Sequence, residues 1–450
     1  MVEKSDPAST TDAKDSSAEV TSPTEFALIW LTGALAGTAL PLTWTDSEQL
    51  TIGRDAECAI HLANTDVSRR HATLRRSSSE PGFLIADLAS RNGTRVNGRL
   101  LHSARLREND VVRLGGCVFV VSDALGSFSE VAPGLYGSAS LKRALAPLQS
   151  VAKSDLPIVL EGETGTGKEL VARAIHTLSG RPGKLVAINC AALPQGLAEA
   201  ELFGYRRGAF TGAERASPGF FRAAEGGTLL LDEASDLPLV LQAKLLRALE
   251  QKAVQPLGEA LPVPVDVRIV VAGQSSLFEA VKRQQFRADL LARLNGITLQ
   301  LPPLRERRPD ILLLFSHFLR ELRPGGMPRL EPEFVERLVL YDWPFNVREV
   351  LQLARRLAVV QGAESVLRAQ HLPREMSLDA ESNSPNPVEP EAPSPVAIDL
   401  ASLLAALRTT GGNVTRAAAQ LGVTRQRAYR LLEEQSVDLA TLSGPRRSKR

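Results

Sequence analysis

Residues 158–168, with the sequence IVLEGETGTGK, decide how the middle of this chain folds. The apolar run 158–160 predicts a buried strand, and a helical pattern begins at Glu169. Between them, the glycines let successive backbone N–H groups point into one concave site, and the N-terminus of the helix adds partial positive charge. This arrangement predicts a phosphate-binding loop in which Lys168 meets the β- and γ-phosphates of ATP. The residues expected to line it are Gly162, Glu163, Thr164, Gly165, Thr166, Gly167, Lys168 and Glu169.

A second motif completes this site about 65 residues later. The apolar run 229–231 ends in Asp232 and Glu233. At the end of a buried strand, Asp232 would hold Mg²⁺ and Glu233 would polarise the attacking water. A glycine-rich loop alone could be only a turn, but the two motifs together predict an ATPase.

Composition limits what the rest of the chain can be. Its 450 residues suit roughly three domains of about 150 residues, and 44% hydrophobic with 23% charged residues is ordinary for a soluble protein. A net charge of +2 does not mark the whole chain as a nucleic-acid binder. Cys58, Cys117 and Cys190 have neither metal-ligand spacing nor an even count, which argues against a disulfide framework and favours the cytoplasm.

The N-terminal third predicts a β-sandwich. Residues 1–23 are poor in large apolar side chains and predict a disordered tail. From 24 to 123, short alternating runs are separated by turn signals such as Asn92-Gly93 and Asn97-Gly98. The expected strands are 50–53, 72–74, 83–86, 111–114 and 117–121.

The uncharged stretch from Phe26 to Thr45 is about long enough to cross a bilayer. It contains Gly33, Gly37 and Pro41, and acidic rather than basic residues precede it. We therefore expect two strands joined near 33–37, and no membrane association.

From 134 to 375 the pattern changes to that of a parallel α/β domain, with strands expected at 158–160, 185–188, 228–231 and 267–272. Residues 376–398 are proline-rich and predict an extended linker. Residues 399–436 predict short helices, and 437–450 form a basic tail.

At this point residues 134–375 resemble the sigma-54-dependent activators of the AAA+ class, an α/β ATPase with a helical lid. The family's phosphate loop also ends in glutamate, as this one does at Glu169. The most specific marker is ELFGYRRGAFTGA at 201–213, which resembles the loop that contacts the sigma factor. Its glycines permit a sharp projection, and we expect Phe210 and Thr211 at an exposed tip that needs a partner. A glycine-rich turn with a buried phenylalanine is the alternative. The contact residues are Gly208, Ala209, Phe210, Thr211, Gly212 and Ala213.

The resemblance implies further roles around the nucleotide. Asn189 would restrain Glu233 until the γ-phosphate is sensed, and Arg348 would be the second nucleotide sensor. Arg287 and Arg293 resemble arginine fingers offered to a neighbouring subunit, which implies a ring, by resemblance a hexamer, with a dimer otherwise. Two residues depart from the family: Phe345 replaces a glycine, and the first sensor is Ala272-Gly273-Gln274, so its sensing of nucleotide is in question.

The sandwich resembles a forkhead-associated (FHA) domain, which implies recognition of phosphothreonine. Arg54 and Ser68 would bond the phosphate, and Asn92 would fix the peptide backbone, with additional contacts from Arg69 and Arg91. His71 is expected to be structural. A sandwich that no longer recognises phosphate is the alternative.

The C-terminal helices resemble the Fis-type helix-turn-helix. The DNA-contacting residues would be Thr424, Arg425, Gln426, Arg427, Tyr429 and Arg430.

The sequence therefore predicts a multidomain protein: a β-sandwich, an α/β ATPase with a helical lid, and a small all-α DNA-binding domain. The expected function is ATP-driven opening of upstream-bound promoters by sigma-54 RNA polymerase, controlled by a phosphothreonine protein. A general AAA+ remodeller and a phosphopeptide-binding DNA adaptor with an inert ATPase domain remain as alternatives.

Overall fold

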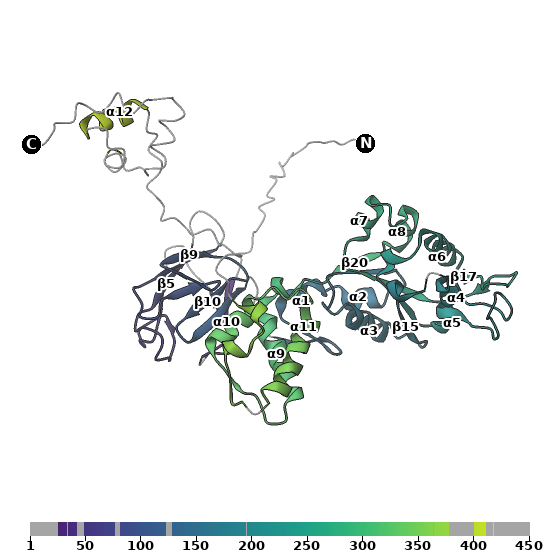
Figure 1. The fold of residues 1–450 in the computed structure, drawn as a ribbon, viewed down its shortest axis with the longest axis horizontal. Coiled ribbons are helices and arrows are strands. Elements are labelled where there is room, and N and C mark those ends of the chain that lie inside the picture. Colours follow the sequence, from purple (N-terminus) through teal and green to yellow (C-terminus); the bar gives the residue numbers. More distant parts are fainter. Residues whose placement is uncertain are drawn as a thin grey trace, which may run out of the picture. The chain divides into compact units, whose positions relative to one another are not determined.

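A computed structural model describes residues 26–33, 35–42, 49–76, 82–122, 128–194, 196–362, 364–377, 400–410 and 417. The chain divides into two compact units, residues 1–386 and 387–450. The larger unit contains a β-sandwich, an α/β domain and a helical lid (Figure 1).

The sandwich predicted for the N-terminal third is confirmed. One sheet has the order β2 (Ala39–Leu42), β1 (Phe26–Trp30), β11 (Cys117–Ser122), β10 (Val111–Leu114), β7 (Thr94–Val96), β8 (Arg99–Leu101). The other has the order β4 (Ile60–His61), β3 (Gln49–Gly53), β5 (Ala72–Arg76), β6 (Phe83–Asp87), β9 (Ser103–Leu106). The uncharged stretch begins with the antiparallel pair β1–β2, as expected, and Gly33 and Gly37 have positive φ in its turn. Asn97 and Gly98, both at positive φ, connect β7 to β8.

Both faces of the central strands of the first sheet, β1, β11 and β10, are buried. Side chains alternate along a strand, so Trp30, Val112 and Phe119 enter the core between the two sheets. The opposite face presents five apolar side chains, which we call the docked face, and they share a hydrophobic core with the lid helices. Each such burial contributes about 1.5–3 kcal/mol. The docked face consists of Ile29, Leu31, Val111, Val118 and Val120.

A hairpin of β12 (Ser129–Ala132) and β13 (Leu135–Gly137) follows the sandwich and leads into the α/β domain. That domain has a five-stranded parallel sheet in the order β15 (Leu185–Asn189), β16 (Thr228–Asp232), β19 (Arg268–Gly273), β14 (Ile158–Glu161), β20 (Ile297–Gln300). Four of these strands lie where the sequence predicts them, and β20 is an addition.

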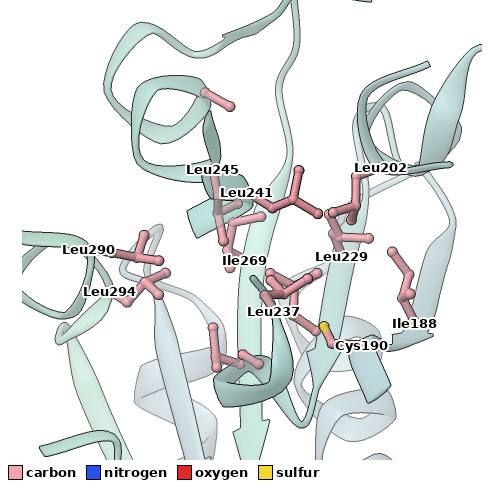
Figure 2. Close-up of a cluster of buried hydrophobic side chains, with 14 of the residues drawn as sticks. Ile188, Cys190, Leu202, Leu229, Leu237, Leu241, Leu245, Ile269, Leu290 and Leu294 are labelled. Atoms are coloured by element: carbon pink, nitrogen blue, oxygen red, sulfur yellow. The ribbon is translucent and has the colours of Figure 1, made fainter. Parts of the chain in front are cut away.

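Helices cover both faces of this sheet. One face packs against α2 (Leu148–Ala152) and α3 (Lys168–Ser179). The other packs against α4 (Ala198–Phe203), α5 (Gly219–Ala223), α6 (Leu239–Gln251) and α8 (Ala288–Leu294). Figure 2 shows Leu241 and Leu245 of α6 beside Ile269 of the central strand. Alternate residues of each strand therefore contribute to two hydrophobic cores, one on each face of the sheet. The polar residues at the strand ends belong to neither core and can form a functional site.

Shorter elements connect these layers, and the lid closes the domain. The connecting elements are α1 (Ala139–Ala144), α7 (Leu277–Lys282), the antiparallel pair β17 (Ala253–Val254) and β18 (Val263–Pro264), and the 3-10 turns η1 (Cys190–Ala192), η2 (Ala234–Asp236), η3 (Leu304–Glu306), η4 (Ala369–His371) and η5 (Arg374–Met376). The lid consists of α9 (Arg308–Leu322), α10 (Pro332–Leu340), α11 (Asn346–Val360) and the parallel pair β21 (Arg329–Leu330) and β22 (Val366–Leu367), with Trp343 fully buried.

In the smaller unit, α12 (Leu400–Thr409) lies where the first helix of the C-terminal domain is expected. The residues predicted to contact DNA, 424–430, lie outside the described residues, as do the predicted tails, 1–23 and 437–450, and nearly all of the linker 376–398. All three cysteines are free thiols. Among the described residues, no helix combines the length and apolarity needed to span a membrane.

Candidate functional site

The glycine-rich loop forms a tight turn between β14 and α3. Gly162, Gly165 and Gly167 all have positive φ, which only glycine adopts without strain. Lys168 Nζ donates to the carbonyl oxygens of Gly162 at 2.6 Å and Glu163 at 3.3 Å, so the loop closes around the ammonium group. Burial lowers the pKa of Lys168, and the nearby charges of Glu233 and Asp232 oppose that shift. The predicted phosphate loop and the two acids are therefore brought together.

The acidic strand end has the features of a metal site. Asp232 is the last residue of β16, and its Oδ1 is buried without a hydrogen-bond partner. An unpartnered buried carboxylate oxygen beside a phosphate loop fits Mg²⁺, which binds through one or two carboxylates together with substrate phosphates. Glu233 has φ 53 and ψ 48, a left-handed conformation that is strained for a residue with a side chain. The roles of the two acids stay predictions.

Asn189 lies beside this acidic pair. It is the last residue of β15 and is in register with Asp232 of β16. Its Oδ1 accepts from the Ala191 amide at 3.0 Å, which caps the following 3-10 turn. The side chain thus stands next to the acids, while its oxygen serves the local turn.

The first-sensor position follows β19, whose last residue, Gly273, accepts a hydrogen bond from the Gly162 amide at 3.2 Å. Gln274 is exposed and lines a cavity of about 460 Å³ with Glu161, Gly162 and Gln300. The departure from the family therefore lies directly beside the phosphate loop.

Two residues from the lid region, Arg305 and Asn346, also contact the phosphate loop. Arg305 donates to both carboxylate oxygens of Glu163 at 2.8 and 2.6 Å, and Asn346 Nδ2 donates to the Thr164 carbonyl at 3.0 Å. The bonds from Arg305 lower the pKa of Glu163. Sequence reasoning missed Arg305 and Asn346, because nothing in the sequence around either residue indicates a contact with this loop.

Two other predicted nucleotide-site residues lie near the same loop. The charge of Arg348 acts on Lys168, so the second-sensor position faces the site. Glu169 pairs instead with Arg173 at 2.7 Å on the exposed side of α3. Glu169 therefore belongs to the first turn of the helix by its backbone, while its carboxylate points away.

The two predicted arginine fingers lie around α8. Arg287 precedes the helix and forms a bidentate pair with Asp289, with N–O distances of 3.0 and 2.6 Å. Arg293 donates to the Leu249 carbonyl at 3.3 Å. Both side chains are exposed, and the Arg287 guanidinium is occupied by Asp289 in this structure.

The 208–213 loop forms a closed turn. The Gly208 amide donates to the Ala213 carbonyl at 2.9 Å. Thr211 is exposed as expected, but Phe210 is half-buried against Tyr205, with ring centroids 5.0 Å apart. The expectation that Phe210 is exposed is therefore wrong in this structure, because an aromatic neighbour five residues away covers its ring.

The sandwich carries a separate polar pocket. Arg54, Ser68, Arg69 and Arg91 line a cavity of about 640 Å³, which fits an anionic group. Ser68 Oγ accepts from the Arg91 amide at 2.9 Å, which leaves its hydroxyl hydrogen available to a ligand. Asn92 donates to the Asp66 carbonyl at 2.7 Å, so its side chain braces the pocket wall.

His71 is structural, as expected. Its ring is fully buried, Nδ1 accepts from the Ser68 amide at 3.2 Å, and Nε2 lies 3.1 Å from the Gly93 carbonyl. Because Nδ1 accepts, the neutral ring carries its proton on Nε2. Burial lowers its pKa, so the neutral form is favoured.

Comparison with known proteins identifies four domains. Residues 50–115 match the FHA domain, 135–300 the sigma-54 interaction domain, 305–388 the AAA+ ATPase lid domain, and 398–431 the bacterial regulatory protein domain of the Fis family. The chain is 41% identical to the transcriptional regulatory protein ZraR of Salmonella typhi over 309 residues, 67% of this chain and 69% of that protein. It is also 45% identical to the DNA-binding transcriptional activator HyfR of Escherichia coli over 236 residues, 52% of this chain and 35% of that protein.

A solved structure shows the same fold. The crystal structure of NtrX from Brucella abortus in complex with ATP matches with a TM-score of 0.50 and 30% identity, covering 67% of this chain and 69% of that one. With the length of the match to ZraR and the order of the four domains, this result identifies the family. The chain belongs to the sigma-54-dependent transcriptional activators and carries an FHA domain ahead of its sigma-54 interaction domain.

Proposed function

We propose that this activator hydrolyses ATP with Mg²⁺ in a ring of identical subunits, by resemblance a hexamer. The observation that carries the proposal is the convergence of Lys168, Asp232 and Glu233, with one oxygen of Asp232 buried and unpartnered. The matching NtrX structure was solved in complex with ATP, which supports nucleotide binding by this chain. Bound Mg²⁺ would neutralise charge between the phosphates, while Glu233 would orient the attacking water.

Hydrolysis would be coupled to sigma-54 through the 208–213 loop. Phe210 lies against Tyr205 in the present conformation, and Thr211 is already exposed. We expect nucleotide turnover to release Phe210 toward the sigma factor, so that promoter DNA opens. Arg287 and Arg293 would stabilise charge on the phosphate bound by the adjacent subunit.

The FHA pocket would bind a phosphothreonine segment of a partner protein. Arg54 supplies a guanidinium fork, and Ser68 supplies a free hydroxyl hydrogen. The C-terminal domain would hold the protein on upstream promoter DNA in the cytoplasm.

The test is ATP-dependent opening of a cognate promoter by purified sigma-54 polymerase. Wild type would be compared with Lys168→Ala and Thr211→Ala, with exposed Lys282→Ala as the control. If only wild type and Lys282→Ala open the promoter, the result supports both the nucleotide site and the sigma-54 contact at the 208–213 loop. ATP turnover without opening by any variant would favour a general remodeller. If neither opening nor turnover occurs while DNA and phosphopeptide binding persist, an adaptor with an inert ATPase domain is the better account.

A further inference from the structure

The docked face of the FHA domain is fixed to the lid by more than apolar packing. Arg113 of β10 forms an ion pair with Glu336 of α10 at 3.0 Å, and the Glu336 side chain is only 1% exposed. A buried ion pair forms only where both partners are held in place, and loss of one partner leaves an uncompensated charge. The pair therefore fixes the orientation of the sandwich on this helix.

A second contact joins the turn before β10 to the start of the lid. Asn109 Nδ2 donates to the Glu306 carbonyl at 3.0 Å, and Arg308 Nη1 donates to the Asn109 carbonyl at 3.0 Å. Asn109 has φ 67, and both its side-chain amide and its main-chain carbonyl contact this segment. We call residues 304–310 the junction segment.

The junction segment also holds the phosphate loop. Arg305 makes the bidentate pair with Glu163, and Arg307 Nη2 donates to the Thr166 carbonyl at 3.3 Å. Residues on either side of Glu306 thus contact the nucleotide loop, while Glu306 itself contacts the FHA domain. One short segment touches both.

The phosphopeptide pocket lies on other loops of the sandwich. It is lined from residues 54–55, 65–70 and 89–91, whereas the lid contacts come from 29–31, 109–113 and 118–120. The FHA domain can therefore hold a phosphopeptide while it remains docked on the lid.

We propose that the docked FHA domain is a positioning element of the nucleotide site, acting through Asn109 and the junction segment. With the sandwich in place, Arg305 and Arg307 hold the phosphate loop in its binding conformation, so ligand binding does not have to order it. When the docking contacts are lost, the loop becomes less ordered and nucleotide affinity falls. This inference rests on the proposed nucleotide site.

The test measures ADP binding to the full-length protein by calorimetry. Asn109→Gly removes the amide donor but tolerates the positive φ, so the turn is retained. We expect it to weaken ADP binding about fivefold, the scale of one lost hydrogen bond. Arg113→Met should have a similar effect, and Arg113→Met/Glu336→Met should restore affinity, because removing both charges leaves none uncompensated. His61→Ala, an exposed change on the other sheet, is the matched control.

Hydrogen exchange provides a second readout that is independent of ligand. Asn109→Gly should speed exchange at the amides of the phosphate loop and the junction segment, and leave those of α6 unchanged. The proposal is overturned if both single variants bind ADP within twofold of wild type, or if His61→Ala weakens binding as much as they do. The proposal is also overturned if Arg113→Met weakens ADP binding, Arg113→Met/Glu336→Met fails to restore it, and hydrogen exchange in the phosphate loop is unchanged. No ADP binding by wild type would instead refute the proposed nucleotide site.

Discussion

Arg305 donates hydrogen bonds to both carboxylate oxygens of Glu163, at 2.8 and 2.6 Å, and so connects the start of the lid to the phosphate loop. A lysine at 305 keeps the charge but cannot form the bidentate geometry. We therefore expect Arg305→Lys to weaken ADP binding about three- to tenfold, the scale of one ordinary hydrogen bond, because lysine can still make a single charged contact with Glu163. Glu163→Gln should have a similar effect, and the double variant should be no worse than either single one. Additive losses would show that the two residues act separately.

Substitutions of Lys168 and Glu233 should affect ATP binding and ATP turnover differently. Glu233→Gln keeps the shape of the side chain but removes the charge that polarises water, so we expect turnover to fall about 100-fold or more. Binding of ATP should persist in this variant and disappear in Lys168→Ala. Steady-state phosphate release and equilibrium binding, measured on the same preparations, check the prediction. Equal turnover by Glu233→Gln and wild type would assign catalysis to another group.

The FHA pocket should depend on its guanidinium and hydroxyl groups. Arg54→Ala and Ser68→Ala should each weaken binding of a phosphothreonine peptide by about 10- to 100-fold, because each removes a charge-assisted hydrogen bond. Fluorescence anisotropy with phosphorylated and unphosphorylated peptides measures the effect. If Arg54→Ala reduces binding of both peptides equally, the pocket does not recognise phosphate.

His71 should make the sandwich sensitive to mild acid. Burial lowers its pKa from 6.5 in the folded state. The unfolded chain therefore takes up a proton first, and stability is full above pH 6.5 and falls as the pH drops below it. The loss cannot exceed about 1.4 kcal/mol per pH unit.

Denaturant unfolding of wild type and His71→Asn between pH 8 and pH 5 isolates this effect. Asparagine cannot titrate, so the variant should show a shallower fall in unfolding free energy below pH 6.5. Asp310 and Glu336, whose pKa values are raised by burial, change stability in the opposite direction in both proteins. Parallel curves for the two proteins would mean that His71 does not titrate on unfolding.

Local patterns made much of this fold predictable. The phosphate loop at 162–167 and the acidic end of the 228–232 strand could be predicted because each is formed by residues that are adjacent in the sequence. The run 117–122, CVFVVS, is apolar at successive positions, which is typical of a strand buried on both faces. Helix α10, more than 200 residues away in the sequence, packs against the second face of this strand. The hydrophobic periodicity of the strand gives no information about which element covers it.

The charged side chains of the lid show the same limit. Arg305, Arg307 and Arg308 stand in one basic run, yet each has a different partner: Glu163, Thr166 and Asn109. Arginine side chains are mostly exposed in folded proteins, so such a run by itself indicates no particular partner. Only the three-dimensional arrangement separates contacts with the phosphate loop from contacts with the sandwich.

The strands β1, β11 and β10 are buried on both faces, and this limits which other N-terminal domain could replace the sandwich. A chain that lost the sandwich would expose the lid surface that shares a core with the docked face and would tend to self-associate. A replacement sensor would have to bring its own apolar strip and a cation to meet Glu336. Chimeras that join a sandwich from one relative to a lid from another should therefore fail at this contact surface before they fail at the ligand.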